Sequence, residues 1–463
     1  MRLAALALAL TLAGCAGLAP SGYQTPQADV PTQWSQATAG TAQAVATPDR
    51  WWRQFNDPAL DRFVESALAR NNDLAAAALR VRQAQLQAGL AGTAMAPTVS
   101  GSVSSSASRR LEGDGNTTSR GSGISLSVGY EVDLWGRLAR SRDAAEWSAT
   151  ATVQDREATA EALAGTAAGL YWQLAYLNQR VANANDSLAY AQRTQQLVQA
   201  QYDAGSVSAL ELREAEQTVS TQRAALTQLE QQRVETRNAM ALLLDAPPGA
   251  ATLAQSGLAA EPVRLPDHAL PDVAAGIPAE LLARRPDLRA AESRLRSQLA
   301  SNDATRASYY PSLTLTGGLG TSSAALLGLL SNPVATLGAG LTLPFLRQNE
   351  MRLTNDLARA QYEEAVVTFR QTLYQAFSDV ENALSARRQY ALQGDELARQ
   401  LTAAREVERL YEVRYRAGST ALRTWLDAQQ SRRSAELAVE ENRLNQLNAL
   451  ATLYRVLGGG VPA

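Results

Sequence analysis

Side chains suited to catalysis are scarce in this chain of 463 residues, which has one cysteine, Cys15, and one histidine, His268. A single cysteine excludes disulfides within the chain and thiolate metal clusters. A single histidine, in a proline-rich stretch, argues against a metal site or a Ser-His-Asp triad, and we expect His268 to be an exposed loop residue. Composition leaves open a hydrolase with paired carboxylates. No cleft-forming α/β pattern surrounds the pair Glu131 and Asp133, so the sequence predicts neither an enzyme nor a cofactor or metal.

Cys15 has another chemistry available to it, because it follows an apparent export signal. Arg2 gives a positive n-region, Leu3 to Leu12 give an apolar h-region, and Ala13 and Gly14 are small. An ordinary signal peptide with a chance cysteine is the alternative. We predict that residues 1–14 are removed and that Cys15 is lipidated, with palmitate as one acyl group. The residue after Cys15 is Ala16 and not aspartate, which resembles the sorting pattern of outer-membrane lipoproteins. A net charge of −2 indicates no nucleic-acid partner.

The chain also repeats itself. Tyr202, Gly205 and Ser206 recur 213 positions later as Tyr415, Gly418 and Ser419. The offset is 214 for an earlier stretch, which carries Asp73 to Asp287. A duplication of about two hundred residues is too long for a solenoid repeat. We infer that one chain supplies two similar halves to a symmetric object.

Each half contains a long block without proline, from 98 to 246 and from 345 to 461. Proline costs about 3 kcal/mol inside a helix, so such blocks permit very long helices. Apolar and small residues recur every three or four positions from Leu212 to Leu229, which is typical of a coiled-coil seam. Gly205 and Gly418 interrupt the helices and predict hairpin tips. Four residues are candidate caps for the next helices: Ser206 or Ser208, and Ser419 or Thr420.

Alternating apolar and polar residues predict four strands in two hairpins, at 98–136 and 311–345. The strands have about the length that crosses a bilayer at a tilt. A soluble two-layer sheet is the alternative. The polar face is predicted to contain Ser125, Ser127, Glu131, Asp133, Thr314 and Thr316.

No apolar run is long enough for a transmembrane helix, and four strands cannot close a barrel. Three copies would close one around a water-filled pore lined by the polar face. The predicted organisation also includes an extended lipidated segment at 15–57, helical segments at 58–97, 137–245, 287–310 and 346–457, a linker or equatorial region at 246–286, and a tail at 458–463.

Several motifs resemble the TolC/OprM-like outer membrane factors, in the NodT-type lipoprotein branch. They are Trp51-Trp52-Arg53-Gln54-Phe55, Tyr130-Glu131-Val132-Asp133-Leu134-Trp135-Gly136-Arg137, Arg284-Arg285-Pro286-Asp287-Leu288 and Leu453-Tyr454-Arg455-Val456-Leu457-Gly458. The resemblance implies a homotrimer with a transmembrane β-barrel, a periplasmic α-helical barrel and long coiled-coil helices. It also implies a periplasmic adaptor and an inner-membrane transporter as partners, and no catalysed reaction.

The resemblance further implies functional positions. The hairpin tips, at Gly205, Ser206, Gly418 and Ser419, would dock on the adaptor. The tunnel would be narrowest beside them, at an acidic residue matched by Asp427. Thr424 departs from the family's acidic pattern, and Glu211, its counterpart 213 positions earlier, would supply the missing charge. Glu214 is the counterpart of Asp427, and we expect Arg423 to pair with Glu211 and latch the closed state. The alternative for each is a solvated carboxylate on a helix surface.

We therefore predict the outer-membrane exit duct of a tripartite efflux pump of the RND type. The duct would be lipid-anchored, with a long periplasmic extension, and gated at its periplasmic end. Two alternatives stay open: the outer-membrane component of type I protein secretion, and a periplasmic coiled-coil scaffold lipoprotein. A pore lined by Ser, Thr and Gly indicates no particular cargo.

Overall fold

The computed structural model describes residues 21–36, 49–109, 118–249, 261–273, 276–323 and 333–460. The predicted signal at 1–14 and the predicted lipidation site Cys15 lie outside the described residues. The chain divides into two compact units. One comprises residues up to Ala28 with Leu79–Gln154 and Arg289–Thr372, and the other comprises Asp29–Ala78, Asp155–Leu288 and Leu373–Ala463. None of the described helices is long and apolar enough to cross a membrane.

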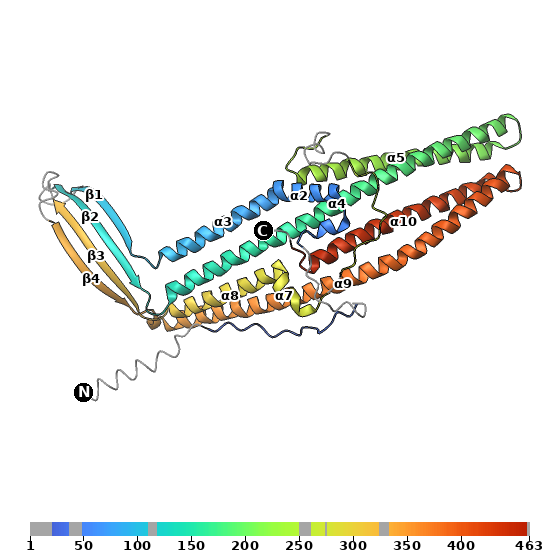
Figure 1. Cartoon of the computed structure of the whole chain (residues 1–463). Helices are drawn as coiled ribbons and strands as arrows, with labels where there is room; N and C mark the ends of the chain where they lie inside the picture. Colours follow the sequence, from blue (N-terminus) through green and yellow to red (C-terminus); the bar gives the residue numbers. More distant parts are fainter. Residues whose placement is uncertain are drawn as a thin grey trace. The chain divides into compact units, whose positions relative to one another are not determined.

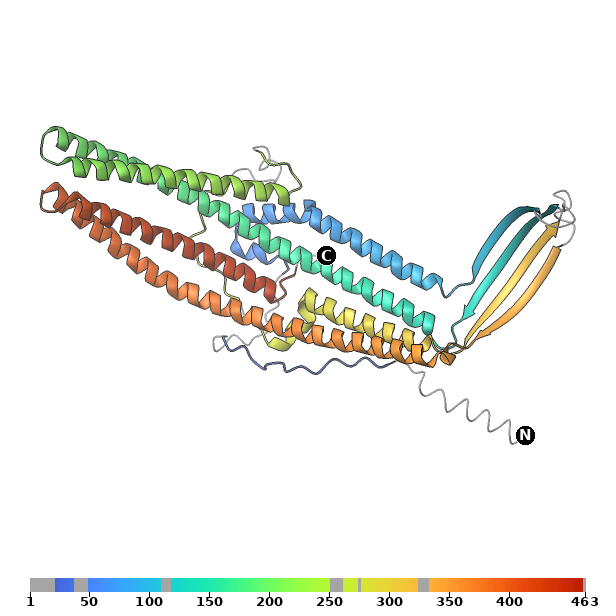
Figure 2. The same cartoon turned by 180° about the vertical axis from the view of Figure 1, so that it is seen from behind.

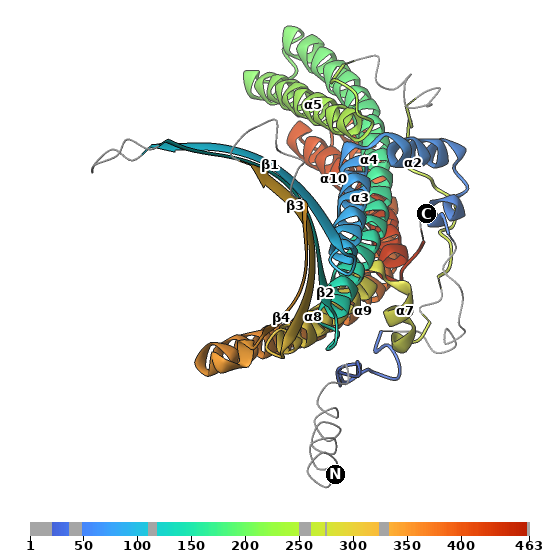
Figure 3. The same ribbon diagram turned by 90° about the vertical axis from the view of Figure 1, so that its left-hand side faces the viewer.

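The first unit contains one antiparallel sheet in the order β1-β2-β3-β4. Its strands are β1 (Thr98–Arg109), β2 (Thr118–Val132), β3 (Ser312–Ser323) and β4 (Pro333–Thr342). The sheet is strongly curved (Figure 3). Leu337, on β4, is 95 % exposed, so the apolar side chains of this face have no cover within the described chain. The edge strands β1 and β4 each pair on one side only, which leaves two open edges.

The sheet joins its helices through short, well-bonded connections. The indole of Trp135 donates to the carbonyl of Pro311 at 2.6 Å, and its ring lies 5.5 Å from that of Tyr310. Both residues stand beside strand ends, so the two hairpins are fastened together there. This unit also holds α8 (Pro286–Ala307), apart from its first residues, and the first parts of α4 (Arg137–Asp203) and α9 (Gln348–Arg416), with the short η5 (Pro344–Leu346) before α9.

The second unit consists mainly of two helical hairpins. α4 turns back into α5 (Ala209–Leu243), and α9 turns back into α10 (Leu422–Val456); the members of each pair lie side by side in both views (Figure 1, Figure 2). The predicted seam is half-buried at Gln222 and Leu226 and buried at its other members, Leu212, Ala215, Val219 and Leu229.

An aromatic cluster closes the opposite end of the second unit. The 3-10 helix η2 (Trp51–Phe55) buries Trp51, Trp52 and Phe55, and Trp51 stacks on Tyr454 of α10 at 5.6 Å. α2 (Pro58–Arg70) is capped by Asp57, whose carboxylate accepts from the N–H groups of Ala59 and Leu60. The remaining short elements are η3 (Pro278–Glu280) and α7 (Leu281–Arg284).

The predicted helical stretch 58–97 is interrupted at Asn71, where α2 ends and α3 (Asn72–Thr93) begins. The side-chain oxygen Oδ1 of Asn71 accepts from the N–H groups of Asp73 and Leu74 at 3.0 and 3.1 Å, so this side chain caps α3. Helix propensity alone missed this break, because no proline or glycine marks it.

Candidate functional site

The two hairpin tips have the same backbone conformation. Gly205 and Gly418 have φ of 72° and 70°, a left-handed region in which an L side chain is strained. The amide of each following serine donates to a carbonyl five residues earlier, Ser206 to Gln201 and Ser419 to Arg414, each at 2.9 Å. This is the Schellman arrangement of helix ends. It accounts for both glycines, as the sequence predicted.

The starts of the two returning helices differ. Ser208 caps α5 in a capping box, in which Glu211 bonds back to the amide of Ser208 at 3.0 Å. α10 starts at Ala421 with no side-chain cap. Of the two candidates at the first tip, Ser208 is confirmed as the cap and Ser206 is not one. The hydroxyls of Ser206 and Ser419 donate backwards to the carbonyls of Gln201 and Arg414, so the prediction of a cap from Ser419 is wrong. No cap from Thr420 forms either.

An aromatic cluster packs behind the second tip. Trp425 of α10 is 2 % exposed and stacks on Tyr415 of α9 at 5.1 Å. The Tyr415 hydroxyl donates to Gln201 Oε1 of α4 at 2.8 Å, which joins the two hairpins. Tyr190 of α4 meets Trp425 edge-on, and burial raises the pKa of Tyr190 to about 12, helped by the charge of Glu412. Sequence reasoning noted Tyr415 only as a repeated residue and missed the cluster, although the helical spacing of Leu422, Trp425 and Leu426 could have revealed a buried face.

Arg423 connects α10 to α5 through charge. Its Nη1 lies 3.6 Å from Glu214 Oε1 of α5, and its Nε lies 3.3 Å from Asp427 Oδ1 of its own helix. A polar groove of about 220 Å³ runs between the two helices at this bridge. The expected pair of Arg423 with Glu211 is wrong. Glu211 occupies the third helical position of α5, where its carboxylate turns back to Ser208, and that hydrogen bond lowers its pKa.

Thr424 and Asp427 stand one turn apart on α10 beside this bridge. Thr424 is half-buried, and Asp427 is exposed. The structure thus brings Glu214, Arg423 and Asp427 together and leaves Glu211 in the turn. In the part of the chain that the structure describes, no group of His, Cys, Asp and Glu is arranged to hold a metal ion.

The polar strand residues share one face of the sheet. Ser125, Ser127 and Glu131 of β2 pair with Gly320, Gly318 and Thr314 of β3, and paired residues point to the same side. Thr316, opposite Gly129, belongs to that face too. Serine hydroxyls form rungs to β1, with Ser127 2.7 Å from Ser100 and Ser125 2.8 Å from Ser102.

Two acidic residues at the end of this face have structural partners. Glu131 forms an ion pair with Arg137 at 2.7 Å. Asp133 lies beyond the end of β2, and its two oxygens accept from the amides of Leu138 and Ala139 at 3.1 and 2.9 Å. The prediction that Asp133 is a strand residue facing a pore is therefore wrong, because its carboxylate satisfies the first turn of α4.

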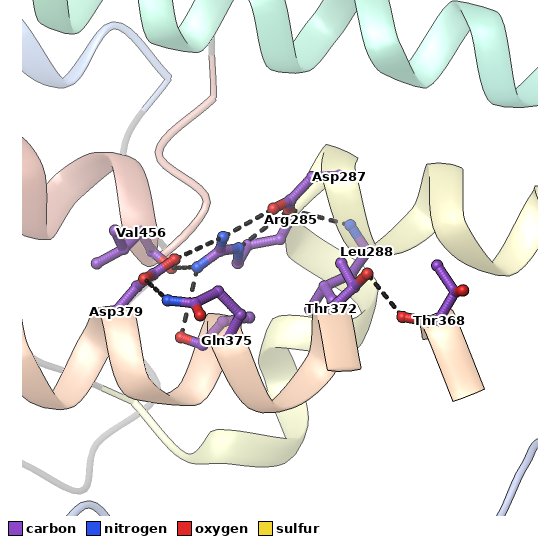
Figure 4. Close-up of polar contacts among 9 residues, drawn as sticks. Arg285, Asp287, Leu288, Thr368, Thr372, Gln375, Asp379 and Val456 are labelled. Atoms are coloured by element: carbon purple, nitrogen blue, oxygen red, sulfur yellow. Dashed lines mark hydrogen bonds and ion pairs between the residues drawn. The ribbon is translucent and has the colours of Figure 1, made fainter. Parts of the chain in front are cut away.

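Arg285, which sequence analysis did not single out for a role, organises the other end of α10 (Figure 4). It is 9 % exposed, and its Nη2 lies 2.7 Å from Asp287 and 3.3 Å from Asp379 of α9. Its Nη1 donates to the carbonyls of Ala376 and Val456 at 3.4 Å. The exposed His268 lies in a loop, as predicted.

A family model described as outer membrane efflux protein matches residues 63–246 and 277–459. The chain belongs to the outer membrane efflux protein family. Each matched segment of this efflux protein contains one strand hairpin and one helical hairpin, so the two matches coincide with the two repeats.

The names of individual proteins similar to this chain are consistent with this family. The pyoverdine export outer membrane protein OpmQ of Pseudomonas putida is 36% identical, over 98% of this chain and 96% of that protein. The probable efflux pump outer membrane protein TtgC of the same species is 31% identical, over 98% and 95%. The solved outer-membrane channel OprN has a TM-score of 0.85 at 25% identity, over 96% of this chain and 99% of that one.

Family membership confirms several predictions for this efflux protein. It has the TolC-like fold and is the outer-membrane channel of an efflux system. Members of the family are channels and not enzymes, so the hydrolase and the coiled-coil scaffold are no longer candidates. Channels of this family are homotrimers that dock with periplasmic adaptors in tripartite pumps.

Proposed function

We propose that this efflux protein is a passive exit duct whose resting gate lies where α10 is held against α5. The observation that carries the proposal is Arg423, which lies 3.6 Å from Glu214 on α5 and 3.3 Å from Asp427 on α10. The bridge couples the two hairpins close to their tips. Arg423 and Asp427 are 70 % and 65 % exposed and only Glu214 is largely covered, so the bridge contributes little to stability and can be broken by a docking partner. Breaking it frees α10 to move outward.

Three copies would complete the duct. Each chain offers an open β1 edge and an open β4 edge, and pairing the β4 edge of one copy with the β1 edge of the next leaves no free edge in lipid. The polar face with Ser125, Ser127, Thr314 and Thr316 would then line the pore. Three Asp427 side chains would form an acidic ring that favours cations. Thr424 adds no charge to that ring, and Glu211 is too closely tied to Ser208 to serve it.

The tips with Gly205, Ser206, Gly418 and Ser419 would dock on the adaptor. No atom lies within 4 Å of a Cβ placed on either glycine, so Gly205→Val or Gly418→Val acts through backbone strain alone. Either change should weaken cross-linking to a purified adaptor while trimers still form. Full cross-linking by both variants would mean that the tips are turns with no docking role.

Lipidation at Cys15 would add an anchor in the outer membrane. The inner-membrane partner would be a transporter of the RND type, which selects the cargo. Relatives named for pyoverdine export and for an efflux pump favour small molecules over the protein cargo of a type I secretion system.

Single-channel conductance in a planar bilayer tests the gate. Arg423→Ala should raise the conductance of the purified trimer, because the link between α5 and α10 is lost. Glu211→Ala is the matched control at the same tip, and it should leave conductance close to that of the wild type. An unchanged conductance in Arg423→Ala would refute the gate assignment.

A further inference from the structure

A cavity of about 960 Å³ lies at the sheet end of α8 and α9 and has no part in the gate, the tips or the pore face. Its walls come from α8, from the turn that leads into β3, from η5 and from α9, and residues Ser21–Gln24 form part of its rim. All of these segments belong to the unit that contains the sheet. The volume is in the range of cavities that hold a small ligand or part of a lipid.

The rim residues Ser21 and Tyr23 are bound to side chains of α8. The amide and hydroxyl of Ser21 donate to the two carboxylate oxygens of Asp303 at 2.8 and 2.6 Å. The ring of Tyr23 covers the guanidinium of Arg296 at 4.3 Å. Because Asp303 already accepts two hydrogen bonds from Ser21, it is a weak partner for Arg306, whose Nη1 lies 3.9 Å from it. Arg306 therefore keeps donors available on the cavity wall.

The cavity changes character along its length. Next to the strands it is lined by Tyr310, Phe345 and Met351, which are aromatic or apolar. Further along α9, away from the strands, it is lined by Asn355, Arg359 and Glu363. Met351 and Glu363 are twelve residues apart, which is about 18 Å on a helix. One end thus suits a hydrocarbon chain and the other a charged group in water.

The polar end carries both signs of charge. Arg306 and Arg359 are balanced by Asp356 and Glu363, and Arg359 Nε donates to Glu363 at 3.0 Å, which leaves its other nitrogens available. The side-chain oxygen of Asn355 is buried with no hydrogen-bond donor in the part of the chain that the structure describes. A buried acceptor of this kind calls for a donor from outside.

We propose that this cavity binds a zwitterionic phospholipid of the ethanolamine class from the inner leaflet of the outer membrane. Arg306 and Arg359 bind the phosphate, while Asn355 and the carboxylates accept from the primary ammonium. The acyl chains lie against Tyr310, Phe345 and Met351, on the side of the strands. The orientation rests on the proposed function, because it takes the sheet to lie in the membrane. A purely anionic lipid or a free phosphate would bring no ammonium group to the wall that carries Asp356 and Glu363.

Native mass spectrometry of the full-length trimer tests the site after delipidation and titration with single lipids. Phosphatidylethanolamine should bind at least about tenfold better than phosphatidylcholine, which has no N–H to donate, and better than phosphatidylglycerol. Arg306→Gln/Arg359→Gln should lose about tenfold or more of this binding. Arg370→Gln/Arg399→Gln removes the same charge from α9 outside the cavity and should bind as the wild type does.

A second variant guards against misfolding of the first. Asn355→Leu should keep the affinity for phosphatidylcholine and lose most of the preference for phosphatidylethanolamine. Equal binding of these two lipids by the wild type, unchanged binding by the double arginine variant, or full displacement of the lipid by inorganic phosphate would overturn the proposal. The double variant should still conduct like the wild type, so a failure of the lipid site is distinguishable from a failure of the channel assignment.

Discussion

The two repeats make one equivalent contact with different chemistry. In the first, the amide of Asn71 donates to the carbonyl of Leu243 at the end of α5, at 3.4 Å. In the second, the guanidinium of Arg285 donates to the carbonyl of Val456 at the end of α10, also at 3.4 Å. Asn71 is neutral, whereas Arg285 brings a charge that Asp287 and Asp379 must balance.

The two hairpin tips also differ in the contacts that hold the returning helix. α5 is held by a capping box within its own first turn, and α10 has no cap. α10 is instead held by Trp425, which packs on Tyr415 and Tyr190, and by Arg423, which reaches Glu214. Local contacts survive when helices separate, whereas contacts between helices do not. We therefore propose that α10 is the helix whose position switches.

The largest effect is expected where a buried charge loses its partner. Arg285→Met should lower the free energy of unfolding by about 3–5 kcal/mol, because Asp287 and Asp379 lose their cation. Asn71→Ala, the equivalent change in the first repeat, should cost about 1 kcal/mol. Hydrogen exchange along α10 and α5 measures both. Equal losses at the two positions would remove the difference between the repeats.

Trp425→Ala should loosen α10 near its tip by about 3–5 kcal/mol, because a large buried ring leaves a cavity. The counterpart of its partner Tyr415 is Tyr202, which is 41 % exposed. Tyr202→Ala should therefore change stability by less than about 0.5 kcal/mol. Exchange of the α10 amides reports the first change. If Tyr202→Ala loosened α5 as much as Trp425→Ala loosens α10, the tips would be equivalent.

Changes to the helix caps test the same difference between the tips, with a smaller expected effect. Ser208→Ala should destabilise the start of α5 by about 1 kcal/mol, and Ala421→Ser should stabilise the start of α10 by up to that amount. Exchange rates of the first-turn amides measure both. No gain in Ala421→Ser would mean that the start of α10 is already satisfied by another group.

A fall in pH into the acid range should reduce the stability of the second repeat more than that of the first, by less than the changes above. Burial alone would raise the pKa of Asp287, but the hydrogen bonds and charge of Arg285 outweigh it and hold that pKa below the usual value. The stability from this pair is present above about pH 4 and is lost as the pH falls through the lowered pKa. Asp287→Asn should flatten the acid limb of the stability profile. Asn71, the counterpart of Arg285, carries no charge, so the first repeat has no equivalent pair to lose.

Much of the fold follows from periodicity. Period-two patterns predicted the hairpins that contain β1 to β4, and proline-free blocks predicted α4, α5, α9 and α10. The side-chain partners did not follow, because spacing along one helix does not say which side chain of a neighbouring helix it meets. For example, Arg423 lies beside Glu214 and not beside Glu211. Glu211 lies in the first turn of α5, where its carboxylate takes part in the capping box. Asp133 was misassigned for a similar reason, since strand alternation cannot distinguish a last strand residue from a helix cap.

A reversible tether between α5 and α10 tests the central claim most directly. The only native cysteine is Cys15, so Glu214→Cys/Arg423→Cys adds the only other thiols. They can be joined by a bifunctional cross-linker that contains a cleavable disulfide. The control for the effect of chemical modification is Glu211→Cys/Arg423→Cys in which one thiol is blocked, so that no tether forms. We predict that tethered trimers stay at resting conductance when the adaptor is added, and that reductant restores opening. Adaptor-induced opening with the tether intact would contradict the account.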